Sequence, residues 1–262
     1  MMSKESKLRI SLFQMDISWE DKAQNLNKVE ACARSLKGKT DLLVLPEMFS
    51  TGFSMSPETL AETNEGPTIS RLKKISSECN LALAGSFIAQ SGENYFNRGF
   101  FVTTDQTHFM DKKHLFRMGE EAKHYTAGSD QKVITYKGFN ISLYICYDLR
   151  FPVWSSNYNN KYDLALYVAC WPEQRRIAWN TLLDARAIEN SAYVCGVNRS
   201  GTDAMNLKYS GDSKLIDPKG SVLAACQKSI EDVATYELDL YTLEEYRRKF
   251  PVWKDADDFR IL

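Results

Sequence analysis

One stretch constrains the fold and the chemistry of this chain more than any other, because in it a buried strand ends abruptly at a cysteine. It reads GFNISLYICYDLRFP and covers residues 138–152. Apolar residues alternate with Ser142 and Tyr144 in its first half, which is typical of a β-strand. Cys146 stands where the strand ends, and Pro152 favours the first turn of a following helix. A cysteine at such an elbow can serve as a nucleophile, because helix N-terminal amides stabilise a thiolate and an oxyanion. Most buried cysteines, however, are inert packing residues.

The bulk composition excludes several classes of partner. The chain has 262 residues, of which 44% are hydrophobic, so it can bury a substantial core as one unit. Its formal net charge of -1 gives no general attraction to nucleic acid or to an anionic membrane. Residues 1–7 are charged and precede a strand without an apolar signal region, and no run approaches membrane-spanning length. We therefore expect a cytoplasmic protein with no nucleic-acid or membrane partner.

The cysteines are scattered, and none forms a C-x-x-C pair. This spacing gives no support to a zinc site or to thioredoxin-like chemistry. Most of them lie in apolar, strand-like segments, which suits reduced core residues of a cytosolic protein. The six positions are Cys32, Cys79, Cys146, Cys170, Cys195 and Cys226.

Hydrophobic patterns predict strands and helices that alternate through both halves of the chain. Strands are expected over residues 8–15, 41–45, 81–89, 95–104, 108–111, 141–145, 163–169, 192–197, 209–216, 221–225 and 234–238. Helices are expected over residues 16–38, 67–79, 151–161, 173–190 and 241–249, with a long structured loop at 115–130. The inward residues of helix 173–190 are predicted to be Ile177, Leu182, Ala185 and Ile188. No linker divides the chain, so we expect one α/β domain over residues 1–262, built as a sheet-rich sandwich.

Three ionisable side chains each stand just past an apolar strand. They are Glu47, one of the neighbouring lysines Lys112 and Lys113, and Cys146. If they converge, the glutamate can take the thiol proton, the lysine can lower the thiol pKa and hold an oxyanion, and the cysteine can attack a carbonyl carbon. Each residue by itself has an ordinary reading, as a solvated acid, a surface lysine or a packed thiol.

The combination resembles the signatures of the nitrilase, or carbon–nitrogen hydrolase, superfamily, whose members use a Glu-Lys-Cys triad. The matching stretches are LVLPE ending at Glu47, KKHL beginning at Lys112, and ICYDLRF around Cys146. Order, strand context and spacing agree, and the likeness spans nearly the whole chain. The family places its lysine two residues before the histidine, which favours Lys112 over Lys113. His114 then becomes a structural neighbour of the site.

The resemblance also implies a second glutamate, which orients the lysine and helps to position water or the amine. The stretch EAKHYTAG assigns it to Glu121, with Glu120 as the adjacent rival. The implied reaction is amide hydrolysis through a thioester on Cys146, with the oxyanion held by Lys112 and the backbone N–H of Tyr147. No metal or organic cofactor is implied. Asp148 and Arg150 are expected to form structural ion pairs near the elbow.

Within the superfamily, the chain is most similar to the bacterial YafV-like branch of omega-amidases. The likeness rests on PEMFSTGF at residues 46–53, KKHLF at 112–116 and ACWP at 169–172, followed by two arginines. That branch hydrolyses the terminal amide of 2-oxo-dicarboxylic monoamides, such as 2-oxoglutaramate and 2-oxosuccinamate, to the 2-oxo acid and ammonia.

A substrate of this kind carries a carboxylate far from the reacting amide. Its recess therefore needs a cation, for which the candidates are Arg175 and Arg176, and an apolar wall. The candidates for the wall are Phe53, Tyr125, Tyr147 and Trp171.

The family fold is a four-layer α-β-β-α sandwich, and its members usually form homodimers or higher homo-oligomers. The resemblance places residues 151–161 and 173–190 at the dimer interface, with residues 241–262 reaching across it. Other substrates stay open within the superfamily, namely N-carbamoyl amines or amino acids and aliphatic amides. Two further alternatives are a non-catalytic member that binds a metabolite or a protein, and a redox-sensing cysteine protein.

Overall fold

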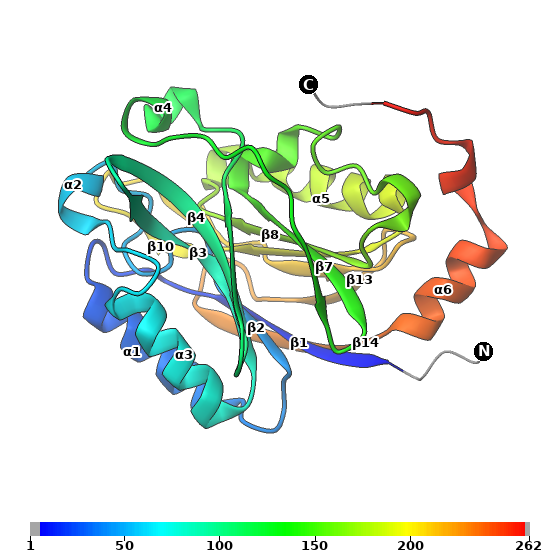
Figure 1. Ribbon diagram of the computed structural model, residues 1–262, viewed down its shortest axis with the longest axis horizontal. Helices are drawn as coiled ribbons and strands as arrows, with labels where there is room; N and C mark the ends of the chain where they lie inside the picture. Colours follow the sequence, from blue (N-terminus) through cyan, green and yellow to red (C-terminus); the bar gives the residue numbers. More distant parts are fainter. Residues whose placement is uncertain (1–5, 260–262) are drawn as a thin grey trace.

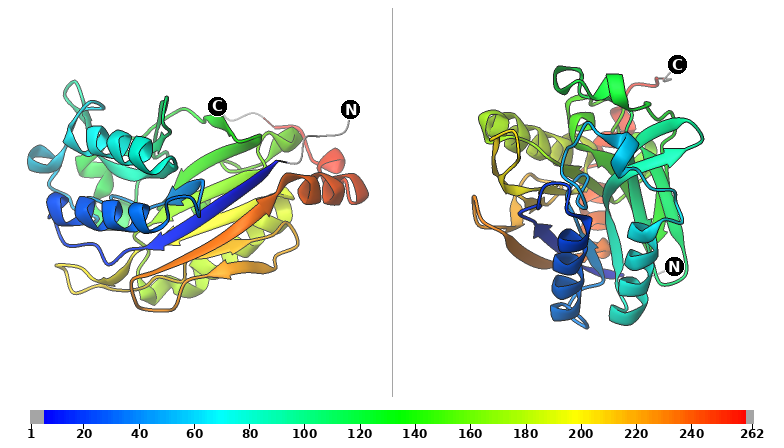
Figure 2. Two further views of the ribbon diagram at one scale, coloured as in Figure 1. Left: turned by 90° about the horizontal axis from the view of Figure 1, so that it is seen from below. Right: turned by 90° about the vertical axis from the view of Figure 1, so that its left-hand side faces the viewer.

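The computed structural model describes residues 6–259, in which two six-stranded β-sheets pack face to face. Helices cover the outer face of each sheet, so the layers run helix, sheet, sheet, helix (Figure 1; Figure 2). This arrangement confirms the predicted α-β-β-α sandwich. Within the described residues, no helix is long and apolar enough to cross a membrane.

The first sheet has a parallel centre flanked by antiparallel strands. Strands β1, β2 and β3 run parallel, whereas β14, β4 and β5 pair antiparallel to their neighbours. Helices α1 (Lys22–Ser35) and α3 (Pro67–Cys79) pack on its outer face. The spatial order is β14 (Asp232–Asp239), β1 (Lys7–Gln14), β2 (Leu42–Val44), β3 (Ala82–Ser91), β4 (Asn94–Val102) and β5 (Thr107–Asp111).

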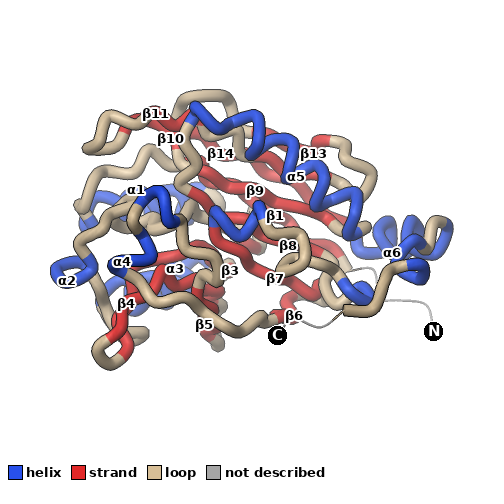
Figure 3. The backbone as a smooth tube through the Cα atoms, turned by 90° about the horizontal axis from the view of Figure 1, so that it is seen from above, coloured by secondary structure: helices blue, strands red, loops and turns tan. Residues whose placement is uncertain are grey.

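The second sheet repeats this plan around β7, β8 and β9, which also run parallel. Helix α5 (Arg176–Asn190) lies along its outer face (Figure 3). The spatial order is β13 (Val222–Ala225), β12 (Lys214–Ile216), β9 (Tyr193–Asn198), β8 (Leu164–Ala169), β7 (Phe139–Ile145) and β6 (Val133–Tyr136). The smaller elements are a ribbon of β10 (Ser200–Thr202) and β11 (Lys208–Ser210), and the helices α2 (Pro57–Leu60), α4 (Glu121–His124) and α6 (Leu240–Lys249).

The core explains why β2 reads as a continuous apolar run. Leu42 and Val44 face the space between the two sheets, while Leu43 and Leu45 face α1 and α3. Successive side chains of a strand point to opposite faces, so a strand covered on both sides needs apolar residues throughout. The same burial lets a catalytic residue placed just beyond the strand end lie inside the molecule.

Helix α5 turns a different face to the sheet than its apolar residues predict. Trp179 and Leu183 are buried, whereas Ile177 and Ile188 are 79% and 51% exposed. The expected inward positions of those two isoleucines are therefore wrong. Two buried polar residues determine the face: Arg186 donates to the Leu149 carbonyl, and Asn190 accepts from a loop N–H.

The predicted helix over residues 151–161 is also wrong. The chain there forms turns and one short 3₁₀ segment, Tyr158–Asn160, and the backbone of Asn159 and Asn160 is left-handed, with φ of 54° and 51°. The Asn157 amide donates to the carbonyls of Tyr162 and Asn190. Asparagine side chains compete with helical backbone bonding in this way, and a run rich in Ser and Asn therefore prefers turns.

The predicted strand over residues 209–216 is interrupted in its middle. It divides into β11 and β12 at Gly211 and Asp212, whose φ values are +71° and 56°. A Cβ on Gly211 would lie 2.0 Å from the Gln14 side chain, so only glycine fits there. The break directs β12 into the second sheet while β11 stays in the two-stranded ribbon.

Candidate active site

Glu47 lies just past β2, in a turn whose backbone is hydrogen-bonded to β3. Its side chain has no exposed surface. The Oε1 atom accepts from Lys112 Nζ at 2.8 Å and from Asn97 Nδ2 at 2.8 Å. The Oε2 atom accepts from the backbone N–H of Cys170 at 2.8 Å. Three donors from three different strands or strand ends therefore fix the position of this carboxylate.

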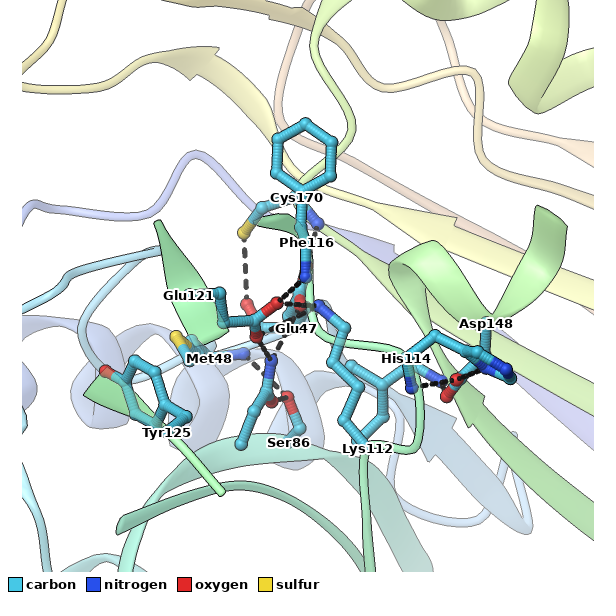
Figure 4. Close-up of polar contacts among 12 residues, drawn as sticks. Glu47, Met48, Ser86, Lys112, His114, Phe116, Glu121, Tyr125, Asp148 and Cys170 are labelled. Atoms are coloured by element: carbon cyan, nitrogen blue, oxygen red, sulfur yellow. Dashed lines mark hydrogen bonds and ion pairs between the residues drawn. The ribbon is translucent and has the colours of Figure 1, made fainter. Parts of the chain in front are cut away.

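Lys112 follows β5, and its side chain is fully buried between two carboxylates (Figure 4). Its Nζ atom lies 2.8 Å from Glu47 Oε1 and 3.0 and 2.9 Å from the two oxygens of Glu121. Its neighbour Lys113 instead lies over the Trp154 ring, 5.5 Å from the centroid. Burial places Lys112 rather than Lys113 in the cluster.

Glu121 begins the short helix α4 and is also fully buried. Its Oε2 atom accepts from the backbone N–H of Phe116 at 2.6 Å, which ties the loop before α4 to the lysine. The rival Glu120 is exposed and paired with Lys123. Glu121 is therefore the second carboxylate of the cluster.

Two carboxylates surround one ammonium, and the pKa values of Lys112 and Glu121 reflect this imbalance. Burial alone would lower the pKa of Lys112, but the charges of Glu121 and Glu47 raise it well above its usual value. Burial raises the pKa of Glu121 despite the neighbouring Lys112 charge, and the charge of Glu47 adds to the rise. The lysine is thus firmly protonated, and the cluster has room for one more proton on a carboxylate.

Cys146 stands at the end of β7 with φ of 46°, a strained conformation for a residue that is not glycine. The chain continues as a short 3₁₀ turn, Cys146–Arg150, rather than as the helix that the sequence suggested. Burial and the nearby Glu47 charge raise the pKa of the thiol well above its ordinary value, against the opposing effect of Lys112. Lys112 lowers this pKa as expected, but burial and the Glu47 charge outweigh its effect, so the thiol needs a base before it can attack.

Asp148 fastens the elbow to the segment that carries Lys112. Its Oδ2 atom accepts from the backbone N–H of Ile145 at 3.1 Å, and its Oδ1 atom accepts from the backbone N–H of His114 at 2.9 Å. The His114 ring lies 2.8 Å from the same Oδ1 atom (Figure 4). It also stacks on the Phe151 ring, with 3.8 Å between the ring centroids. Asp148 therefore has a structural role near the elbow, through hydrogen bonds to two backbone N–H groups and the His114 ring.

Both Cys146 and Cys170 line a cavity of about 700 Å³. Aromatic side chains form much of its wall, which suits a small ligand with an apolar backbone. Phe53, Tyr147 and Trp171 lie in this wall as expected, together with Trp19, Phe116 and Tyr209.

Tyr125, the remaining residue expected in the wall, does not line the cavity. It is buried, and its hydroxyl donates to the Ser54 carbonyl at 2.6 Å. A tyrosine in a loop gives no sequence signal for which side of the loop its ring occupies. Its role is to support the Ser54 segment from behind.

Two arginines line the cavity, but Arg176, one of the two candidates for the substrate-binding cation, does not. Arg175 lies over the Phe116 ring at 5.1 Å, and Arg150 lies over the Trp171 ring at 5.1 Å. Arg176 instead forms a bidentate pair with Asp212. The expectation that Arg150 forms a structural ion pair is wrong, because its guanidinium lies over the Trp171 ring in the cavity wall.

The comparisons with known proteins agree with this geometry. The carbon-nitrogen hydrolase family model matches residues 9–248, which is most of the chain. The chain belongs to the carbon–nitrogen hydrolase family. Membership fits a buried glutamate, lysine and cysteine that meet at the ends of β2, β5 and β7.

Relatives of this hydrolase include enzymes that act on amides. Omega-amidase YafV of Escherichia coli K12 is 43% identical over 257 residues, covering 97% of this chain and 98% of that protein. The 2-oxoglutaramate amidase of Bacillus subtilis is 32% identical, covering 95% and 97%. A CN-hydrolase superfamily protein from Xanthomonas campestris, solved with an arsenic adduct in its active site, is 39% identical, with a TM-score of 0.94 and coverage of 98% and 99%.

The sequence did not reveal every residue that this hydrolase brings to its site. Asn97, on β4, donates to both Glu47 and Glu121. Its only sequence signal is a polar residue inside an apolar strand. The backbone N–H of Cys170 could not be foreseen at all, because a main-chain donor has no signature in the residue type.

Proposed function

We propose that this hydrolase releases ammonia from 2-oxoglutaramate and related 2-oxo-dicarboxylic monoamides. Two relatives that match nearly the whole chain are an omega-amidase and a 2-oxoglutaramate amidase. The observation that carries the proposal is the buried cluster of Glu47, Lys112 and Glu121 beside Cys146, which lines a cavity together with Arg150 and Arg175.

The first half of the proposed reaction forms a thioester. Glu47 accepts the Cys146 proton as the sulfur attacks the amide carbon, because the buried thiol does not ionise by itself. The oxyanion is held by Lys112 Nζ and the backbone N–H of Tyr147. Glu47 then gives its proton to the amide nitrogen, the C–N bond breaks and ammonia leaves.

The second half hydrolyses that thioester. Water loses a proton to Glu47 or Glu121 as its oxygen attacks the thioester carbon. The same two donors hold the second oxyanion. The C–S bond then breaks, the proton returns to the Cys146 sulfur, and the 2-oxo acid leaves. Glu121 also keeps Lys112 in place throughout, through contacts of 3.0 and 2.9 Å.

The distal carboxylate of the substrate is proposed to bind Arg175, which lines the cavity and has no carboxylate partner among the described residues. Arg150 provides a second cation in the same cavity. Phe53 and Trp171 provide apolar surface along the substrate chain. Arg176 is excluded because Asp212 already occupies its guanidinium.

Ammonia release tests the substrate assignment directly. The panel is 2-oxoglutaramate, glutamine, propionamide and an N-carbamoyl amine, with Cys146→Ala as the control variant. The proposal predicts that 2-oxoglutaramate is hydrolysed fastest and that the variant is inactive. Preference for the carbamoyl amine or for propionamide would overturn the substrate and keep the reaction class. Glutamine tests whether the 2-oxo group is recognised.

We further propose a homodimer of this single-domain chain, formed through α5. Its exposed Ile177 and Ile188 support this, since large apolar side chains on a helix surface favour association. Residues 241–259 of the C-terminal segment, with exposed Tyr241 and Phe250, are proposed to extend the interface, and residues 260–262 lie outside the described structure. Light scattering should give a dimer mass, and Ile177→Glu should reduce it to that of one chain.

A cytoplasmic location is proposed because all six cysteines are free.

A further inference from the structure

We propose that Asn97 is a positioning residue that fixes Glu47 and Glu121 relative to each other for proton transfer, by donating a hydrogen bond to each carboxylate. The inference deepens the proposed function and rests on its assignment of Glu47 as the base. Asn97 lies in the middle of β4 and has no exposed surface. It contacts all three charged members of the cluster, two through its side chain and one through its backbone.

The contacts of Asn97 place a neutral amide between two carboxylates. Its Nδ2 atom donates to Glu47 Oε1 at 2.8 Å and to Glu121 Oε1 at 3.0 Å. Its backbone carbonyl accepts from the Lys112 N–H at 3.0 Å. One residue therefore sets the distance between the two acids and the position of the lysine backbone.

The orientation of the Asn97 side-chain amide is fixed by two successive hydrogen bonds that end on its oxygen. The Met48 N–H donates to Ser86 Oγ at 2.9 Å, and the Ser86 hydroxyl donates to Asn97 Oδ1 at 2.9 Å (Figure 4). Because the carboxylates on the other side only accept, the amide nitrogen must face them. A flipped amide would point its oxygen at two anions and its nitrogen at a hydroxyl that already receives a donor.

Charge explains why a neutral donor belongs at this position. The titratable groups around the amide are Glu47, Glu121 and Lys112, with Cys146 and Tyr125 beyond them. A third acid would add a negative charge that the single ammonium cannot offset. A second cation would add positive charge beside the carboxylate that must accept the thiol proton. The amide stabilises both carboxylates without either effect.

The amide also leaves Glu47 a site for the thiol proton. Its two N–H bonds go to the Oε1 atoms of the two acids. The Oε2 atom of Glu47 has only the Cys170 N–H as a donor from the described residues. An acceptor position therefore stays free on Glu47 for the proton of Cys146, whose thiol pKa is raised by burial and by the charge of this carboxylate.

The test compares Asn97→Asp with Ser86→Ala. Asparagine and aspartate have nearly the same shape, but the aspartate replaces both N–H donors with an acceptor. The rate at which iodoacetamide alkylates Cys146 is followed against pH by peptide mass spectrometry, together with kcat and KM for 2-oxoglutaramate. Alkylation needs Glu47 as base but no substrate, so it tests the inference even if the substrate assignment fails.

The acidic limb of the alkylation profile is the pH range in which the rate falls as the pH is lowered. In Asn97→Asp this limb should move up by about one pH unit, because carboxylates that lose N–H donors are protonated more easily. The kcat should fall about 100-fold with KM changed less than about threefold. Ser86→Ala removes the donor that fixes the amide from behind, so it should move the limb in the same direction by a smaller amount. Asn97→Asp/Glu121→Gln restores the charge count and should return the limb toward its original position.

An unmoved limb in Asn97→Asp would overturn the inference and reduce Asn97 to a packing residue. If that variant does not fold, Asn97→Ala decides the question, because it removes both donors without adding charge. It should move the limb in the same direction, and an unmoved limb there would be equally decisive. Failure of the wild-type enzyme to hydrolyse 2-oxoglutaramate would count against the proposed substrate alone.

Discussion

The two ends of strand β2 carry carboxylates in opposite electrostatic settings. Asp41 immediately precedes the strand, and Glu47 follows it. Asp41 is held by two cations: Arg9 Nη2 lies 3.0 Å and Lys137 Nζ 2.8 Å from its Oδ1 atom. Glu47 instead shares the single cation Lys112 with a second acid. One end has more cations than acids, and the other has more acids than cations.

The difference separates a structural cluster from a reactive one. Burial opposes ionisation of Asp41, but its bonds to Arg9 and Lys137 lower its pKa to about 2. That carboxylate stays charged under all ordinary conditions and cannot exchange protons. At the other end, burial raises the pKa of Glu121, and the thiol of Cys146 also stays protonated. A surplus of buried acids leaves room for the proton that acyl transfer must move.

The largest effect should come from the nucleophile beside the Glu47 end. Cys146→Ala removes the only atom proposed to form the thioester, so kcat for 2-oxoglutaramate should fall at least about 10⁴-fold. The melting temperature should change little, since the residue lies in a strained turn. Retained ammonia release would show that the Glu47 end is not the reaction centre.

The surplus acid gives the next largest effect. Glu121→Gln keeps the shape and an oxygen for the Phe116 N–H but removes the second charge on Lys112. The kcat should fall about 100-fold, because the lysine loses its fixed position and the water loses a candidate base. Glu120→Gln, which changes an exposed neighbour, should stay within about twofold of wild type in the same ammonia assay.

The comparison between structural and reactive charges also applies to two arginines, one without a carboxylate partner and one paired with Asp212. Arg175→Ala should raise KM for 2-oxoglutaramate about 10- to 100-fold with little change in kcat, because a charged hydrogen bond to bound substrate is lost. Arg176→Ala breaks a pair with Asp212 outside the cavity and should leave KM unchanged. Equal KM values for both variants would remove Arg175 from the binding site.

The smallest effect is predicted at the Asp41 end, and it concerns stability alone. Asp41→Asn should lower the free energy of unfolding at pH 7 by about 1 to 2 kcal/mol, since both cations are partly exposed and screened. The lowered pKa means that this contribution is present above about pH 4 and is lost as the pH falls through 2. Denaturation at pH 7 and pH 2 should show the difference between wild type and variant disappear at the lower pH, with kcat unaffected.

The residue patterns predicted the central strands well, because a strand buried on both faces is apolar throughout, whereas the four-layer order was implied by the family resemblance. Continuous apolar runs marked β2 and β8, and both lie in parallel sheet centres. The patterns failed where polar side chains determine the backbone, as in residues 151–161, where asparagines bond to carbonyls. They also failed for α5, whose buried Arg186 and Asn190 turn two isoleucines outward.

The site was predicted to the extent that each residue follows a recognisable strand. Glu47, Lys112 and Cys146 do so, and the structure brings them together. Arg150 and Tyr125 were misplaced because loop residues carry no record of the direction in which they point. Asn97 was missed because its partners are 50 and 24 positions away along the chain. Only folding places its amide between them.

Trapping the acyl-enzyme tests the central claim most directly. Wild-type enzyme is mixed with 2-oxoglutaramate, quenched rapidly in acid and digested. The masses of the peptides that contain its six cysteines are then measured by mass spectrometry. The account predicts the mass of the acyl group on the peptide that contains Cys146, and its absence after Cys146→Ala. An acyl group on Cys170 instead, or ammonia release that continues without any Cys146 adduct, would contradict the account.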